Sequence, residues 1–129
     1  MITAEQIMAA HAQVKSGADF PSYIQAIKAM GVTHYEAYVT DGHTDYHGTN
    51  NHTATVPAKY APVAIAPQYD EDGFTAILKA HQQGKTDYRT FIADCARMGV
   101  HKWQVSLEQM TCTYYNSAGQ PVLVEAIPH

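Results

Sequence analysis

The sequence predicts an α+β fold in which two copies of a helix–helix–three-strand unit share one antiparallel sheet. Three observations predict it: an internal repeat, helical patterns that end at glycines, and alternating apolar patterns after those glycines. Each unit would bury one sheet face under its own helices, and two such units join most economically as a single sheet. We therefore expect two layers with pseudo-twofold symmetry, in which helices cover one sheet face and leave the other open.

The internal repeat aligns the two halves of the chain at an offset of 68 residues. Identical residues at this offset include Ile24 and Ile92, Met30 and Met98, Gly31 and Gly99, Tyr46 and Tyr114, and Val56 and Val124. Upstream the offset is 70, and it pairs Ile7 with Ile77, Ala10 with Ala80 and His11 with His81. We interpret this as a tandem duplication within one domain, residues 1–129. The repeats cover about 1–58 and 70–129, and a Pro-containing connector, 59–69, joins them as an edge strand or an extended crossing.

Capping signals predict the helices of the first unit. Thr3 and Gln6 have the spacing of a capping box, which predicts a helix from Thr3 to about Lys15. Asp19 is the expected N-cap of a second helix that ends at Gly31, where glycine accommodates a left-handed backbone conformation. The same signals in the second unit predict helices at about 72–83 and 88–98.

After each closing glycine, apolar residues alternate with polar ones, which predicts strands. In the first unit Tyr35, Ala37 and Val39 are expected to face the helices. Asp41-Gly42 then predicts a two-residue hairpin loop with a type I′ turn. This loop sets the register of the hairpin, and the expected cross-strand pairs are Thr40 with His43, Val39 with Thr44, Ala37 with Tyr46, and Glu36 with His47.

Composition excludes several classes of function. The chain has 8 Lys and Arg against 12 Asp and Glu, which disfavours binding to nucleic acid. It contains no apolar run long enough to span a membrane, and its first residues do not resemble a signal peptide. Two cysteines without a CxxC motif indicate a reducing compartment, so we expect a cytoplasmic protein.

Two histidines and a carboxylate are the candidate metal ligands. In the expected register His34, Glu36 and His47 share the sheet face away from the helices, with cross-strand neighbours about 5 Å apart at Cβ. Two imidazoles and a carboxylate suit zinc or another divalent first-row metal. The alternative is a solvated polar face with one Glu–His pair and no cofactor, because no dense ligand motif such as H-E-x-x-H is present.

The same sheet face offers a candidate interaction surface, formed by Tyr38, His43, Asp45 and Tyr115. Exposed tyrosines among small polar residues are typical of protein interfaces, although scattered surface tyrosines are also common on strands. The sequence has no P-loop, GxGxxG, GxSxG or CxxC pair, which removes the commonest cofactor and nucleophile classes. Cys112 is expected to face the helices as a buried apolar side chain rather than a nucleophile.

Four segments of the chain resemble the YbcV-like proteins, a bacterial domain family of unknown function with some members labelled "phage envelope protein". These segments are Lys15–Pro21, Asp41–Thr44, His81–Tyr88 and the run Met-Thr-Cys-Thr-Tyr-Tyr at 110–115. The resemblance spans nearly the whole chain. It implies a small α+β fold and, for some members, prophage association, but no reaction and no catalytic residues.

Two functional hypotheses follow from these observations. The first is a non-enzymatic binding or accessory protein that acts through the open sheet face or a sheet edge, with a second copy of itself or another protein as partner. The second is a metal-binding protein or metal-dependent hydrolase that uses His34, Glu36 and His47. A small-molecule pocket between the two repeats is a third possibility.

Overall fold

The computed structural model describes residues 3–12 and 19–127. Within these residues it contains four α-helices and a six-stranded antiparallel sheet, so the α+β class is confirmed. The elements in chain order are α1 (Ala4–His11), α2 (Phe20–Ala29), β1 (Val32–Tyr38), β2 (Thr44–Gly48), a short 3-10 helix (Thr49–Asn51), β3 (Thr53–Val56), α3 (Glu71–Gln82), α4 (Tyr88–Arg97), β4 (Val100–Ser106), β5 (Thr111–Asn116) and β6 (Pro121–Ala126).

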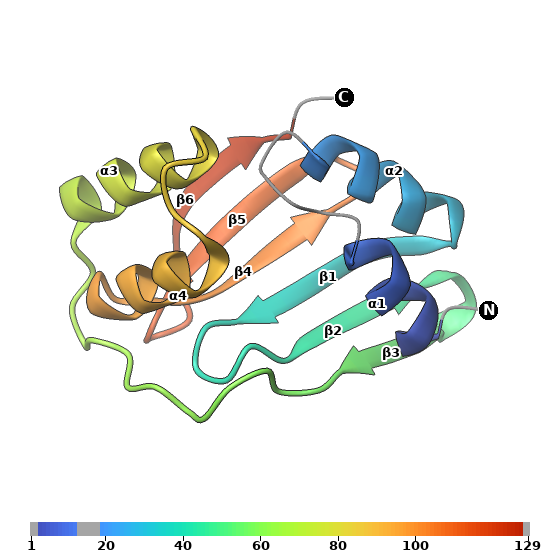
Figure 1. Cartoon of the computed structure of the whole chain (residues 1–129), viewed down its shortest axis with the longest axis horizontal. Coiled ribbons are helices and arrows are strands. Elements are labelled where there is room, and N and C mark those ends of the chain that lie inside the picture. The colour runs from blue at the N-terminus through green and yellow to red at the C-terminus, as the bar shows by residue number, and fades with distance from the viewer. Residues whose placement is uncertain (1–2, 13–18, 128–129) are drawn as a thin grey trace.

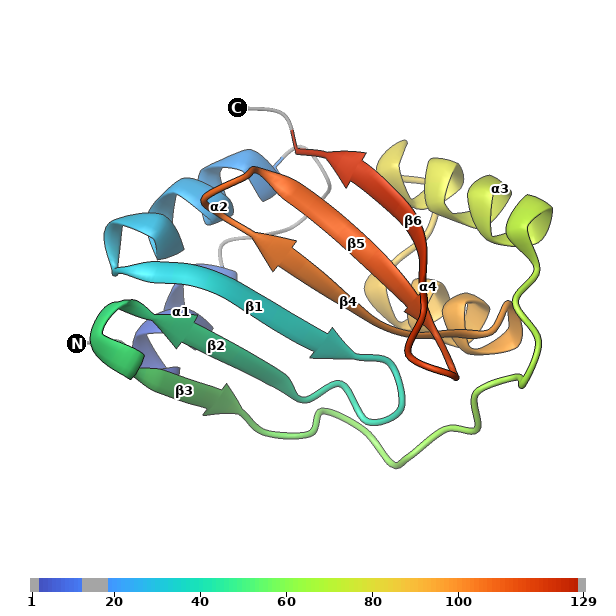
Figure 2. The ribbon, with the colours of Figure 1, turned by 180° about the vertical axis from the view of Figure 1, so that it is seen from behind.

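The sheet has the strand order β3-β2-β1-β4-β5-β6, and the central pair is β1 with β4. All four helices lie over one face of this sheet (Figure 1). The reverse view shows the strands with no helix in front of them (Figure 2). One sheet face is therefore open, as the apolar pattern predicts. In the described part of the chain, no helix is long and apolar enough to cross a membrane.

The capping signals locate the helix ends closely. The capping box of Thr3 and Gln6 is present at the start of α1, and Asp70 and Asp87 each accept a backbone N–H at the start of α3 and α4. Gly31 ends its helix with a positive φ of 98°. Asp19 is the N-cap of α2, as predicted, although its side chain makes no capping hydrogen bond to the helix. The predicted end of α1 near Lys15 lies outside the described residues.

The inward-facing residues of the strands form the core with the helices. Tyr35, Ala37 and Val39 are buried as predicted, with exposed fractions of 5% or less. The helices contribute Ile24, Ile27, Phe74 and Ile92, among others. This single core occupies the space between the helix layer and the sheet, so it leaves the outward-facing side chains of the strands free to form a surface.

The β1–β2 hairpin does not have the predicted register. Glu36 pairs with Asp45 instead of His47, and His47 pairs with His34. The loop contains four residues, Val39–Gly42, because the Tyr38 N–H still donates to the His43 carbonyl, at 3.0 Å. A type I′ turn is also excluded, since Gly42 is the one residue of this loop with a positive φ.

Neighbouring segments explain the wider loop. The Val39 N–H donates to the carbonyl of His101 in β4, at 2.9 Å. The carbonyls of Thr40 and Asp41 accept from backbone N–H groups of the connector at Val63 and Lys59, at 2.7 and 2.8 Å. In a two-residue turn the Thr40 carbonyl would instead accept from His43 within the hairpin, so it could not bind Val63. The connector itself forms no strand. It is an extended crossing from β3 past the β1–β2 loop to α3, one of the two predicted alternatives (Figure 1).

The third strands of the two halves differ in environment. Val56 pairs with Thr44 and is buried, whereas the aligned Val124 pairs with Thr113 and is 60% exposed. The pairing of β6 with β5 is displaced by one residue relative to that of β3 with β2, since Cys112 pairs with Glu125. Because alternate residues of a strand point to opposite faces, a displacement of one residue turns Val124 away from the core.

Candidate functional site

The open face is defined by nine outward-pointing side chains of the central strands and the β1–β2 hairpin. They are His34, Glu36, Tyr38, His43, Asp45, His47, Lys102, Gln104 and Tyr115. The alternation that sends Tyr35 and Ala37 into the core sends their neighbours to this face. No helix covers these nine residues, yet all are only partly exposed. They shield one another, which indicates an ordered surface.

An ion pair lies near the centre of the open face. The Lys102 ammonium donates to Glu36 Oε2 at 2.6 Å, across the β1–β4 boundary. It also lies over the rings of Tyr38 and Tyr115, at 5.6 and 5.2 Å from their centroids. The hydrogen bond to Glu36 raises the pKa of Lys102. Two aromatic rings therefore flank one cation, an arrangement in which each ring face attracts the charge.

Stacked histidines occupy one end of the open face. The rings of His34 and His47 are parallel within 8°, with centroids 4.5 Å apart. Thr33 Oγ1 lies 3.0 Å from His34 Nδ1. His47 Nε2 is buried and has no hydrogen-bond partner within the described residues. It lies 3.8 Å from Glu36 Oε1, which is too far for a hydrogen bond.

The three predicted metal ligands are neighbours, but they are not directed at one point. The lone pair of an imidazole nitrogen lies in the plane of its ring, and the stacked planes of His34 and His47 do not meet. Glu36 is also held by Lys102. Among the residues that the structure describes, no group of three His, Cys, Asp or Glu is arranged to hold a metal ion. Metal binding here would require one ring to turn.

A second stack lies at the hairpin end of the open face. The Tyr38 and His43 rings are parallel within 8°, with centroids 4.2 Å apart. Asp41 Oδ1 accepts the His43 backbone N–H at 3.0 Å and lies 2.5 Å from His43 Nδ1. These bonds lower the pKa of Asp41. Asp45 accepts from the Thr55 hydroxyl at 2.9 Å. The polar groups at this end are thus held in fixed positions.

The structure brings together the four residues predicted as an interaction surface. Tyr38 and His43 stack on each other, Asp45 follows on β2, and Tyr115 lies on the far side of Lys102. The sequence pattern did not reveal that Lys102 lies between Tyr38 and Tyr115 and connects them. The alternating pattern of β4 places Lys102 on the outer face, but its contact with Glu36 depends on the β1–β4 pairing.

The two cysteines are not candidates for catalysis. Cys95 and Cys112 are free and buried, as expected for Cys112. Burial raises the pKa of Cys112 to about 12 and also raises the pKa of Cys95. A nucleophilic cysteine needs exposure and a lowered pKa, and these thiols have neither.

The fold and the open face define a class: a two-layer α+β protein with one uncovered sheet face that is polar and aromatic. The chain belongs to the DUF1398 family, described as proteins of unknown function, whose model matches residues 8–126. This match covers all four helices in part or whole and every strand of the sheet.

Three curated proteins are also similar to part of the chain. Each carries the name "uncharacterized protein"; two come from strains of Mycobacterium tuberculosis and one from Mycobacterium bovis. Each is 42% identical over 53 residues, which is 41% of this chain and 32% of the relative. The match thus spans about a third of the length of these curated relatives.

Proposed function

We propose that this chain is a non-enzymatic accessory protein that assembles through its open face, and that its partner there is a second copy of the chain. The observation that carries the proposal is the ordered network of aromatic, cationic and carboxylate side chains on a face without covering helices. Lys102, held between Tyr38 and Tyr115, is its centre. Tyrosine loses little conformational entropy when it is buried in an interface.

Charge complementarity favours a second copy. In a twofold interface the same patch meets itself, so it must carry both members of each complementary pair. The open face satisfies this condition, because the Lys102 cation lies on β4, Glu36 lies on the adjacent strand β1, and Asp45 lies on β2, one strand further out. A strongly acidic or basic patch would repel its own copy.

The sheet edges are weaker candidates than the open face. The outer strand β3 has four residues, and the outer strand β6 begins at Pro121, which cannot donate a backbone hydrogen bond. Short edge strands and edge prolines are features that discourage pairing with another chain.

Sedimentation equilibrium from low micromolar to near-millimolar concentration tests the proposal. We expect the wild-type chain to form a dimer. Its dissociation constant should rise at least about tenfold in Tyr115→Ala, which removes a ring from the centre of the interface. It should rise by a similar factor in Lys102→Glu, which places like charges there. The matched control is Lys79→Glu, which makes the same charge change on the exposed surface of α3 and should leave the dimer intact.

A protein that stays monomeric over the whole range contradicts the proposal. So does a dimer that Tyr115→Ala and Lys102→Glu leave unchanged. Circular dichroism of each variant confirms that it is folded before its mass is interpreted, and Tyr115→Phe provides a milder substitution that keeps the ring.

We also infer that the two halves arose by tandem duplication, with repeats at about 1–58 and 70–129 in one domain. Supporting this, each half has two helices followed by three strands, and Gly31 and Gly99 both have positive φ at the end of the second helix. The antiparallel pairing of β1 with β4 is compatible with a pseudo-twofold axis between them.

The cellular location and the origin of the chain are also part of the proposal. The free thiols support a cytoplasmic location. Prophage association rests on the resemblance to the YbcV-like proteins.

A divalent-metal site at His34, Glu36 and His47 is the second candidate function. The observation in its favour is the buried, unpartnered His47 Nε2 close to Glu36. The test is elemental analysis of purified, untagged protein after incubation with Zn²⁺ and exchange into chelator-free buffer. This candidate predicts about one metal per chain, with loss of the metal in His47→Ala. Metal-free protein, or stoichiometric metal retained in the variant, would exclude the assignment.

A further inference from the structure

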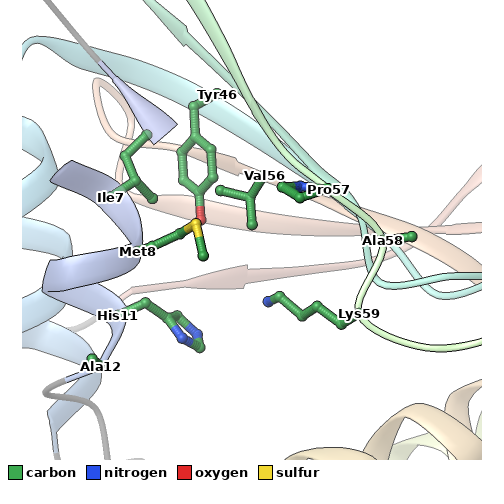
Figure 3. Close-up of a pocket in the computed structure, with 9 residues that line it drawn as sticks. All are labelled: Ile7, Met8, His11, Ala12, Tyr46, Val56, Pro57, Ala58 and Lys59. Carbon is green, nitrogen blue, oxygen red and sulfur yellow. The ribbon is translucent and has the colours of Figure 1, made fainter. Parts of the chain in front are cut away.

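A pocket of about 340 Å³ opens between α1 and the chain that follows β3. It lies on the helix side of the sheet and is separate from the open face. Residues of α1 form one wall, the segment from Val56 to Lys59 forms the other, and Tyr46 of β2 lies at its inner end (Figure 3). This volume falls in the lower range of small-molecule sites.

Two nitrogen-bearing side chains face each other across the pocket. Lys59 extends from the connector and His11 from the last turn of α1, and they point toward one another (Figure 3). The Lys59 ammonium lies 5.2 Å from the centroid of the Tyr88 ring, and His11 packs edge-on against Tyr23 and Tyr88. Within the described residues, no carboxylate forms an ion pair with Lys59 or His11.

A bound anion would stabilise the charged form of both side chains, Lys59 and His11. Although Lys59 is exposed over part of its surface, the loss of water around its ammonium lowers its pKa. Burial lowers the pKa of His11, and the positive charge of Lys59 lowers it further. A bound negative charge would compensate for this desolvation and repulsion.

The rest of the pocket is largely apolar. Met8 is 50% exposed on the rim, and Ile7, Val56 and Pro57 complete the apolar surface. The aligned helix of the second half buries its residue at the position of Met8. Leu78, at the 70-residue offset from Met8, is 4% exposed, whereas Met8 stays at the surface.

We propose that this pocket binds a small organic carboxylate, with its charged end held by Lys59 and His11 and its apolar tail along Met8, Val56 and Pro57. One lysine matches a single negative charge, and His11 can donate a further hydrogen bond in its neutral form. The apolar wall favours a ligand with an aliphatic tail over a small inorganic anion.

Isothermal titration calorimetry of the full chain with octanoate tests the proposal, and amide NMR spectra locate the site. We expect saturable binding of one octanoate per chain, with amide shifts centred on residues 7–12 and 56–59. Acetate lacks the tail and octanol lacks the charge, so each should bind at least about tenfold more weakly. Lys59→Met should weaken octanoate binding about tenfold or more, and Lys59→Arg should retain most of it.

Lys79→Met, an exposed lysine of α3, is the matched control and should not change octanoate affinity. The connector contact made by the Lys59 backbone N–H does not depend on its side chain, so Lys59→Met should fold. Several results would overturn the proposal: no octanoate binding at millimolar concentration, binding that folded Lys59→Met retains in full, or amide shifts elsewhere in the chain. Tighter binding of inorganic phosphate than of octanoate would also overturn the assigned ligand class.

Discussion

Phe74→Ala should lower the free energy of unfolding by about 3–5 kcal/mol, the range for loss of a buried phenylalanine. Phe74 is completely buried between α3 and the sheet. Its ring packs against Tyr114 of β5 at 5.0 Å and against Tyr69 of the connector at 6.1 Å between centroids. Alanine would leave a cavity among three segments that cannot all move inward. Urea denaturation followed by circular dichroism measures the loss.

Two further substitutions test whether the loss of stability comes from the buried ring of Phe74. Thr75→Ala changes the exposed neighbouring position of α3 and should alter stability by less than about 0.5 kcal/mol. Phe74→Leu keeps most of the apolar volume and should cost clearly less than alanine. A loss below about 1 kcal/mol in Phe74→Ala would contradict the packing of α3 on the sheet described above.

Gly99→Ala should destabilise the protein by about 3 kcal/mol, from a left-handed backbone and a steric conflict together. Gly99 has a φ of 84°, and a Cβ built there would lie 2.3 Å from the Gln68 carbonyl oxygen of the connector. The connector is tied to this turn by two hydrogen bonds, from Ala66 to Ala96 and from Asp70 to Met98, both 2.9 Å. Relief of the clash would strain or break them.

Gly84→Ala is the matched control, because Gly84 has a similar φ of 77° but open space where its Cβ would lie. This variant should lose only about 1 kcal/mol, the cost of the left-handed conformation alone. Thermal or urea unfolding of both variants gives the difference directly. Equal losses at the two glycines would show that the connector does not approach Gly99 as closely as described.

Local signals in the sequence predicted most of the fold. The capping box at Thr3, the N-cap at Asp19 and the closing glycines depend on residues close in sequence, so they can be recognised without the structure. Alternation likewise predicted which side chains of β1 enter the core. Both kinds of signal report short-range geometry.

The wrong hairpin register lies where segments distant in sequence form hydrogen bonds with the backbone of the β1–β2 loop. Asp41-Gly42 has the chemistry of a two-residue turn, but the connector and β4 bind the backbone of residues 39–41 and widen the loop. The resulting register places His47 beside His34, where the rings stack. No local pattern contains this information, and so the predicted geometry of the three candidate metal ligands was wrong in register although all three lie on the expected face.

The sequence predicts which residues lie on the candidate surface, but not the contacts between their side chains. Tyr38, His43, Asp45 and Tyr115 were assigned to one surface from alternation alone. Lys102 joins that surface through Glu36, which is 66 residues away in sequence. The pocket beside Lys59 could not be predicted either, because it depends on where the connector passes α1 in space.

We propose that the open face is the contact surface between two copies of the chain. The most direct test is a comparison of amide NMR spectra recorded below and above the concentration at which the protein associates. We predict shifts concentrated in β1, β4 and β5, with the signals of α3 and α4 unchanged. Spectra that do not depend on concentration, or shifts confined to the helices, would contradict the claim.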